Sequence, residues 1–207
     1  GEGGQRDLAQ QLDSLGGKIL RINADGSIPA DNPFPGSPVY SYGHRNVQGL
    51  AWTATGLMLA TEHGPTGENG WYAHDELNII QPGKNYGWPV VIDSPGDPRF
   101  VDPLIQSGND TWAPSGLTFY NGDLLSAWKG SLFFAGLRGQ ALYRVVLGGP
   151  AGDQVVAQEE LFKGKYGRLR VVAQGSDGSL YFATNNRDGR GTAAADDDRI
   201  LRVVPGP

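Results

Sequence analysis

A short strand pattern that returns at near-equal spacing is the feature that most constrains the fold of this chain. Residues 18–22 (KILRI) return as 141–145 (ALYRV) and 199–203 (RILRV), and 76–80 (ELNII) are a looser copy. The first strongly apolar residues of the copies stand at positions 19, 77, 142 and 200, so the gaps are 58, 65 and 58 residues. Near-equal gaps of this size indicate one repeated supersecondary unit.

The residues between these copies indicate β-structure. Apolar runs alternate with glycine turns, as where Asp177-Gly178 separates 171–173 (VVA) from 179–183 (SLYFA). Asp-Gly between apolar strands is a strong hairpin signal. The 32 glycines and 14 prolines among 207 residues are typical of many tight turns. Each unit therefore reads as strand, turn, strand, loop and strand, and helix is confined to a turn or two within residues 5–15.

Repeated all-β units of this kind predict a β-propeller, and a β-sandwich with accidentally similar strands is the alternative. The gaps exceed the ~40–50 residues of common blades, so we expect long loops. Residues 1–207 are interpreted as a single partial domain, made of the last strand of a first unit and three further units, about three and a half blades. A propeller needs at least ~4 blades to close. We therefore expect that N-terminal blades are missing here, and that further sequence or a second copy in a homodimer covers the open edges.

Composition and charge exclude several functions. The net charge is −5 and no Lys/Arg-rich run exists, which argues against a nucleic-acid partner. No apolar run approaches the ~20 residues of a membrane span. The absence of cysteine excludes disulfides and thiolate metal sites.

Three stretches are too polar and too rich in glycine to be strand cores. They are 42–49 (YGHRNVQG), 61–65 (TEHGP) running on to 75–78 (DELN), and 83–89 (GKNYGWP). Polar loop residues on a rigid β scaffold are where function tends to lie. We expect these loops to converge at one face of the propeller and to form its site.

These stretches, in this order, resemble the C-terminal part of the soluble quinoprotein glucose and aldose sugar dehydrogenases, the glucose/sorbosone dehydrogenase-like family. The resemblance spans nearly the whole chain and includes 113–116 (APSG), 136–139 (GLRG) and 167–170 (GRLR). It implies a six-bladed propeller with pyrroloquinoline quinone (PQQ) and Ca²⁺ in its channel mouth. It also implies oxidation of an aldose sugar to a lactone by hydride transfer to the quinone, an external electron acceptor, and a periplasmic or secreted bacterial location.

The resemblance implies a set of cofactor-binding residues. PQQ has three carboxylates, and Arg recognises carboxylates in planar, bidentate fashion. Arg45 and Asn46 are also expected beside the quinone and sugar, in a catalytic role. The alternatives to cofactor binding are arginines on the protein surface and, for Trp112, packing in the core. Arg168 and Arg170 stand two positions apart, so on a regular strand they would share a face. The set comprises Arg45, Asn46, Thr111, Trp112, Arg138, Arg168 and Arg170.

The resemblance also implies two calcium sites. The carbonyls of Gly64 and Pro65 would hold the cofactor-bound ion, since Ca²⁺ accepts backbone oxygens. Glu76 and Tyr86, the latter through its carbonyl, would hold the second. The alternatives are an ordinary Gly-Pro turn and a solvated carboxylate at a blade edge.

The general-base histidine of the family lies before the region that matches this chain. His44 and His63 are therefore interpreted as supporting residues, and the chain alone is expected to be inactive. Two functions remain open on the sequence: the cofactor side of a PQQ-dependent sugar dehydrogenase, or a non-catalytic calcium- and carbohydrate-binding propeller module.

Overall fold

The computed structural model describes residues 4–93 and 95–206, which form antiparallel sheets and three short 3₁₀ helices. The all-β prediction is confirmed. The 3₁₀ helices are η1 (Arg6–Gln10), η2 (Glu68–Gly70) and η3 (Ser126–Trp128). The strands are β1 (Lys18–Leu20), β2 (Val39–Tyr42), β3 (Val47–Trp52), β4 (Met58–Glu62), β5 (Glu76–Ile79), β6 (Ile105–Gln106), β7 (Pro114–Tyr120), β8 (Ser131–Gly136), β9 (Leu142–Gly148), β10 (Gln154–Leu161), β11 (Leu169–Gln174), β12 (Leu180–Thr184) and β13 (Ile200–Val203).

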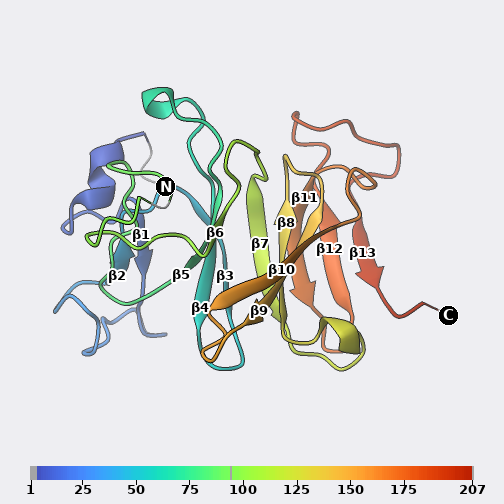
Figure 1. Ribbon diagram of the computed structural model, residues 1–207, viewed down its shortest axis with the longest axis horizontal. Coiled ribbons are helices and arrows are strands. Elements are labelled where there is room, and N and C mark those ends of the chain that lie inside the picture. Colours follow the sequence, from blue (N-terminus) through green and yellow to red (C-terminus); the bar gives the residue numbers. More distant parts are fainter. Residues whose placement is uncertain (1–3, 94, 207) are drawn as a thin grey trace.

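The strands form four sheets in which each strand pairs with its neighbour in the chain (Figure 1). The sheet orders are β1-β2, β3-β4-β5-β6, β7-β8-β9-β10 and β11-β12-β13. The sequence repeat is a structural repeat, because β5, β9 and β13 are each the third strand of their sheet. One detail of the prediction is wrong: the first unit contributes two strands, β1 and β2, rather than only its last.

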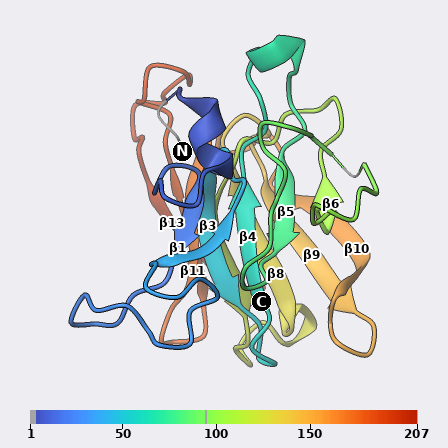
Figure 2. The ribbon, with the colours of Figure 1, turned by 90° about the vertical axis from the view of Figure 1, so that its left-hand side faces the viewer.

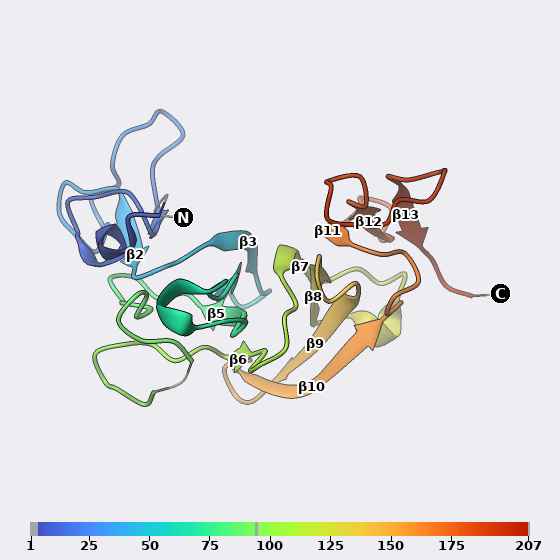
Figure 3. The same ribbon diagram turned by 90° about the horizontal axis from the view of Figure 1, so that it is seen from above.

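Seen from above, the sheets fan out from the inner strands β3, β7 and β11 (Figure 3). Strand β7 lies between β3 and β11 and contacts both. Large buried side chains fill the space between successive sheets, which is why each blade needs its neighbours. One cluster, with Leu77 and Phe134, joins the second and third sheets, and another, with Phe133 and Phe182, joins the third and fourth.

Glycines let the inner strands approach one another closely. A Cβ atom on Gly49 of β3 would lie 2.7 Å from both Leu117 N and Ser115 O of β7. A Cβ atom on Gly116 of β7 would lie 2.9 Å from the Cα atom of Val171 in β11. Only a residue without a Cβ fits such backbone contacts. Gly49 and Gly116 therefore set how closely the inner strands β3, β7 and β11 approach one another.

Turns and loops sort to the two ends of the sheets. The Asp177-Gly178 hairpin is confirmed: Gly178 has φ +78°, and Asp177 Oδ1 accepts the Ser179 N–H at 3.0 Å. The chain segments 43–46, 63–75, 107–113, 137–141 and 185–199 emerge at the opposite, upper end in Figures 1 and 2, where η2 also stands. The described residues include no helix long and apolar enough to cross a membrane.

Candidate functional site

The turn that follows β4 is wrapped around the guanidinium group of Arg45. Arg45 Nη1 donates to the His63 carbonyl at 3.3 Å, and Nη2 donates to Thr66 Oγ1 at 3.1 Å. Nε and Nη2 donate to Glu68 Oε1 at 3.2 and 2.7 Å. Four of the five guanidinium N–H groups are thereby used. Arg45 therefore closes the loop 63–68, and its charge is balanced by Glu68.

Glu68 is held as a carboxylate by this contact. Partial burial raises its pKa, but hydrogen bonds from Arg45 and from the Thr66 N–H, with the charge of Arg45, outweigh burial and lower the pKa to about 2. The guanidinium of Arg45 also lies over Trp88, 5.6 Å from the ring centre. Neither Glu68 nor Trp88 was assigned a role from the sequence, because both reach Arg45 only through loop folding.

Five of the residues predicted from the sequence line one small cavity of about 20 Å³. A cavity of that size holds about one water molecule or one ion. The carbonyl-bearing turn and the acidic and aromatic candidates thus meet at one place. These residues are Arg45, Gly64, Pro65, Glu76 and Tyr86.

Glu76 lies in an acidic environment within this cavity. Burial, followed by the negative charge of Glu62, raises its pKa well above the ordinary value. Its Oε2 accepts a hydrogen bond from Asn78 Nδ2 at 3.0 Å, and it forms no ion pair within the described residues. Those residues include no group of three or more His, Asp or Glu side chains arranged around a common metal position. A calcium ion here would therefore depend on backbone oxygens together with Glu76, a ligand mixture that Ca²⁺ accepts.

The phenol of Tyr86 is already engaged. Its hydroxyl donates to the Ile79 carbonyl at 2.6 Å and accepts the Gln81 N–H at 2.9 Å. Burial raises its pKa. These contacts leave the backbone carbonyl of Tyr86 as the atom by which it could ligate a metal.

His44 belongs to a buried hydrogen-bonded chain. Its Nε2 lies 2.8 Å from Ser41 Oγ and its Nδ1 lies 2.9 Å from Glu62 Oε2. The order Ser-His-Glu is that of a catalytic triad, but all three residues are at most 4% exposed. The His44 ring stacks on Tyr86 at 4.5 Å. The arrangement supports the loop from within and offers no access for a substrate.

Asn46 and His63 flank this series of hydrogen-bonded side chains. Glu62 Oε1 accepts the backbone N–H groups of Arg45 and of Asn46, the latter at 3.3 Å. The Asn46 side-chain oxygen accepts Gln48 Nε2 at 3.0 Å. His63 is adjacent: burial lowers its pKa, and its Nε2 is buried without a hydrogen-bond partner. The charge of Asp75 opposes this lowering of the pKa of His63, whereas the charges of Arg45 and Arg170 add to it.

Thr111, Trp112 and Arg138 line a second, polar pocket of about 540 Å³. The backbone N–H of Arg138 donates to the Trp112 carbonyl at 3.1 Å. Trp112 is 8% exposed, and its ring packs on Phe134 and Tyr143, with ring centres 5.6 and 5.5 Å away. This geometry favours core packing, the alternative weighed for Trp112, over stacking on a ligand.

Arg168 and Arg170 differ in their surroundings. Arg168 is 7% exposed, precedes β11, and donates from Nη2 to Asp188 Oδ2 at 2.8 Å. Arg170 is exposed, and the one hydrogen bond of its side chain to a described residue is a 3.5 Å contact of Nη1 with Ser115 Oγ. The pairing register shifts between Leu169 and Val171, so the regular alternation that would place both arginines on one face is interrupted.

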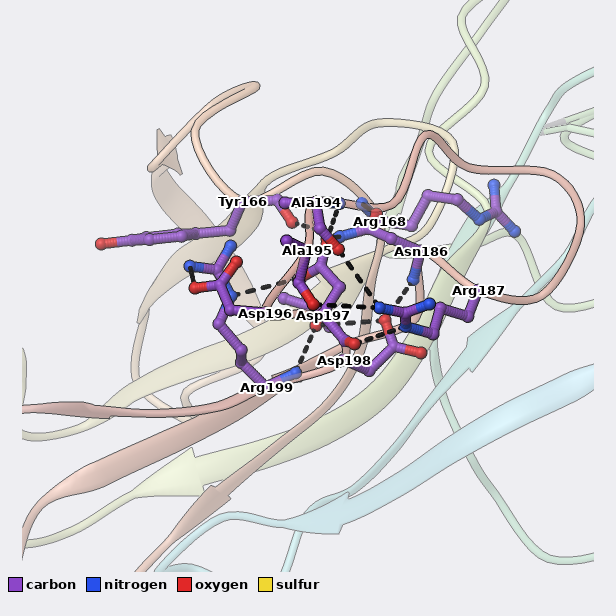
Figure 4. Close-up of polar contacts among 11 residues, drawn as sticks. Tyr166, Arg168, Asn186, Arg187, Ala194, Ala195, Asp196, Asp197, Asp198 and Arg199 are labelled. Carbon is purple, nitrogen blue, oxygen red and sulfur yellow. Dashed lines mark hydrogen bonds and ion pairs between the residues drawn. The ribbon is translucent and has the colours of Figure 1, made fainter.

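The loop 185–199 forms a cross-linked support behind Arg168 (Figure 4). Asn186 Oδ1 accepts the Arg168 N–H at 2.8 Å, and Asn186 Nδ2 donates to the Tyr166 carbonyl and to Asp197 Oδ2, each at 2.9 Å. The Asn186 N–H donates to Asp198 Oδ1. The carboxylate partner of Arg168 comes from this loop as Asp188, which sequence reasoning missed.

An arc of radial antiparallel β-sheets around the inner strands β3, β7 and β11 defines part of a β-propeller. Residues 1–201 match the Glucose / Sorbosone dehydrogenase family. The chain belongs to that family.

Individual relatives agree with this family assignment. The PQQ-bound aldose sugar dehydrogenase from Streptomyces coelicolor is 46% identical with a TM-score of 0.84, over 98% of this chain and 56% of that one. The aldose sugar dehydrogenase YliI of Escherichia coli is 36% identical over 99% of this chain and 55% of its own length. Quinoprotein glucose dehydrogenase B of Acinetobacter calcoaceticus is 54% identical over 88 residues, 41% of this chain and 17% of its own. The chain thus spans little more than half of the first two relatives.

Proposed function

We propose that this chain supplies the cofactor-cation and calcium side of a PQQ- and calcium-dependent aldose sugar dehydrogenase. The whole protein would oxidise an aldose to its lactone and pass electrons to an external acceptor, in the periplasm or outside the cell. The observation that supports this most directly concerns Arg138 and Arg170. Within the described residues neither forms an ion pair, whereas Arg45 and Arg168 do.

Cations without a carboxylate partner fit an anionic cofactor. Arg138 and Arg170 would bind carboxylates of PQQ, and Arg168, held by Asp188, would add positive charge behind them. The buried, unpartnered Nε2 of His63 is a further polar atom that a ligand at this end would satisfy. The cavity has room for one ion, which Glu76 and the Tyr86 carbonyl would hold. The carbonyls of Gly64 and Pro65 would hold the calcium ion of the cofactor, outside that cavity.

When bound, PQQ would supply the hydride acceptor and calcium would polarise it. The residues of this chain would bind, orient and exclude water. The S. coelicolor relative is a PQQ-bound form, which supports PQQ as the cofactor. The general base is expected outside this chain, so turnover is expected only when the remaining blades are supplied.

The test is direct binding. PQQ is titrated into the chain with and without CaCl₂ and followed by calorimetry and quinone absorbance, for wild type and for Arg138→Gln and Arg170→Gln. Each substitution removes a charge-assisted contact that contributes about 1.5–3 kcal/mol, so we expect PQQ affinity to fall at least about tenfold. Arg21→Gln, in an exposed pair with Asp31, is the matched control and leaves the affinity unchanged.

A second function is supported by the Arg45–Glu68 pair, which removes one cation from the anion-binding set. Calcium binding without PQQ binding would favour the non-catalytic calcium- and carbohydrate-binding module. Binding of neither would exclude both functions for this chain.

A further inference from the structure

Asp75 is a buried carboxylate that lies between the two halves of the candidate site. It is 2% exposed and forms no ion pair with any described residue. Its Oδ1 accepts the Gly64 N–H at 2.9 Å. Its Oδ2 accepts the N–H groups of Trp112 and Ala113 at 2.7 and 2.8 Å. Burying a carboxyl group is costly unless its oxygens are hydrogen-bonded, and here backbone N–H groups supply those hydrogen bonds.

The two segments that Asp75 joins are those to which different ligands have been assigned. Gly64 belongs to the calcium turn, and Trp112 follows Thr111 in the wall of the polar pocket. The Trp112 carbonyl in turn accepts the Arg138 N–H at 3.1 Å. An unbroken series of hydrogen bonds therefore runs from Gly64 through Asp75 and Trp112 to Arg138.

Asp75 also holds a strained residue. Ala113 has φ +45°, in the left-handed region that non-glycine residues avoid. Such a conformation persists only where the surrounding contacts determine it. Asp75 is itself anchored, because its N–H donates to Ser107 Oγ at 2.8 Å and its carbonyl accepts the Ser107 N–H at 2.8 Å.

We propose that Asp75 is a positioning residue that couples the calcium turn at Gly64 and Pro65 to the cofactor wall at 111–113 and Arg138. The proposal rests on the proposed function. One carboxylate sets the relative position of both segments, so calcium binding at the turn orders the wall for PQQ. By linkage, PQQ binding raises calcium affinity by the same factor.

The test compares Asp75→Asn with Asp177→Asn. An amide has one acceptor oxygen and a donating NH₂ group, so the side chain introduced by Asp75→Asn cannot serve the donors on both sides. Asp177 is the matched control, because its carboxylate also accepts a backbone N–H, that of Ser179 at 3.0 Å, at a hairpin at the opposite end of the sheets.

Two readouts are needed. The first is the ratio of PQQ dissociation constants without and with calcium, measured by calorimetry. We expect this ratio to exceed about tenfold in wild type and in Asp177→Asn, and to be several-fold smaller in Asp75→Asn, where only direct contact between calcium and PQQ would remain. The second is amide hydrogen exchange of Gly64, Trp112 and Ala113 in the ligand-free chain. We expect exchange at least about tenfold faster in Asp75→Asn alone.

Each result decides a different claim. If wild type binds no PQQ, the proposed function fails, and hydrogen exchange still decides whether Asp75 orders both segments. An unchanged calcium ratio, or unchanged exchange at Trp112 and Ala113, overturns the proposal. If Asp75→Asn does not fold, Ser107→Ala removes only the hydrogen bond that Ser107 Oγ accepts from the Asp75 N–H and keeps the one from the Ser107 N–H to the Asp75 carbonyl. It is expected to reduce the calcium ratio partially, and an undiminished ratio in that variant counts equally against the proposal.

Discussion

Replacing Gly64 with alanine tests whether the turn at Gly64 and Pro65 is shaped by close backbone contact. A Cβ atom at this position would lie 1.8 Å from the Ala73 carbonyl oxygen and 2.4 Å from that of His74. Ordinary contact begins at 3.4 Å, so the Ala73 carbonyl would have to move by 3.4 − 1.8 = 1.6 Å. Ala73 and His74 both have left-handed backbones, with φ 64° and 55°, and have little freedom to give way.

The magnitude follows from the nature of the obstacle. Adding a methyl group to a packed core costs about 1–3 kcal/mol when side chains can shift. Here backbone must move, so we expect Gly64→Ala to lower the free energy of unfolding by at least about 3 kcal/mol, a large part of the ~5–15 kcal/mol that typically stabilises a domain. For a chain of this size, that corresponds to a melting point lower by roughly 6–12 °C.

The assay is urea unfolding followed by tryptophan fluorescence, with Gly56→Ala as the control. Gly56 has φ +85° but nothing within 4 Å of its added Cβ atom. That substitution is expected to cost only the ~1–2 kcal/mol of a left-handed residue. If Gly64→Ala destabilises the chain no more than Gly56→Ala does, the reasoning about close contact is refuted.

Three other predictions concern packing, pH and metal. Phe134 is fully buried and stacks on Tyr143 at 4.6 Å; Phe134→Ala should cost about 3–5 kcal/mol in urea unfolding, and a loss below about 1 kcal/mol would contradict the packing between the second and third sheets. The pKa of Glu68 is lowered to about 2, so its contribution to stability is complete above about pH 4.5 and lost as pH falls toward 2; stability measured against pH should show this acid limb in wild type but less of it in Glu68→Gln. Since burial and Glu62 raise the pKa of Glu76, Glu76→Gln should stabilise the calcium-free chain at pH 7 while reducing the rise in melting temperature that calcium produces; a melting shift with calcium equal to that of wild type would exclude Glu76 as a ligand.

Much of the candidate site could be located from the sequence, because its residues stand in glycine-rich loops that follow strands. Arg45, Gly64, Pro65, Glu76 and Tyr86 do line one cavity. The ion-pair partners and the burial of the site residues could not be predicted. Loops whose course no local pattern specifies decide three features of the site. Arg45 is paired with Glu68, Arg168 is paired with Asp188, and Trp112 is buried.

The sequence by itself determined the repeat, the β-strands and the hairpin turns. These depend on short-range chemistry: alternating apolar residues, and glycines such as Gly178 with positive φ. Only the tertiary structure decided which strand of each blade carries the repeat, how closely Gly49 and Gly116 bring the inner strands together, and which donors meet at Asp75. The physical reason is distance along the chain. Asp75 accepts hydrogen bonds from residues 11, 37 and 38 positions away, and the two longer-range contacts exist only once the second and third sheets have packed side by side.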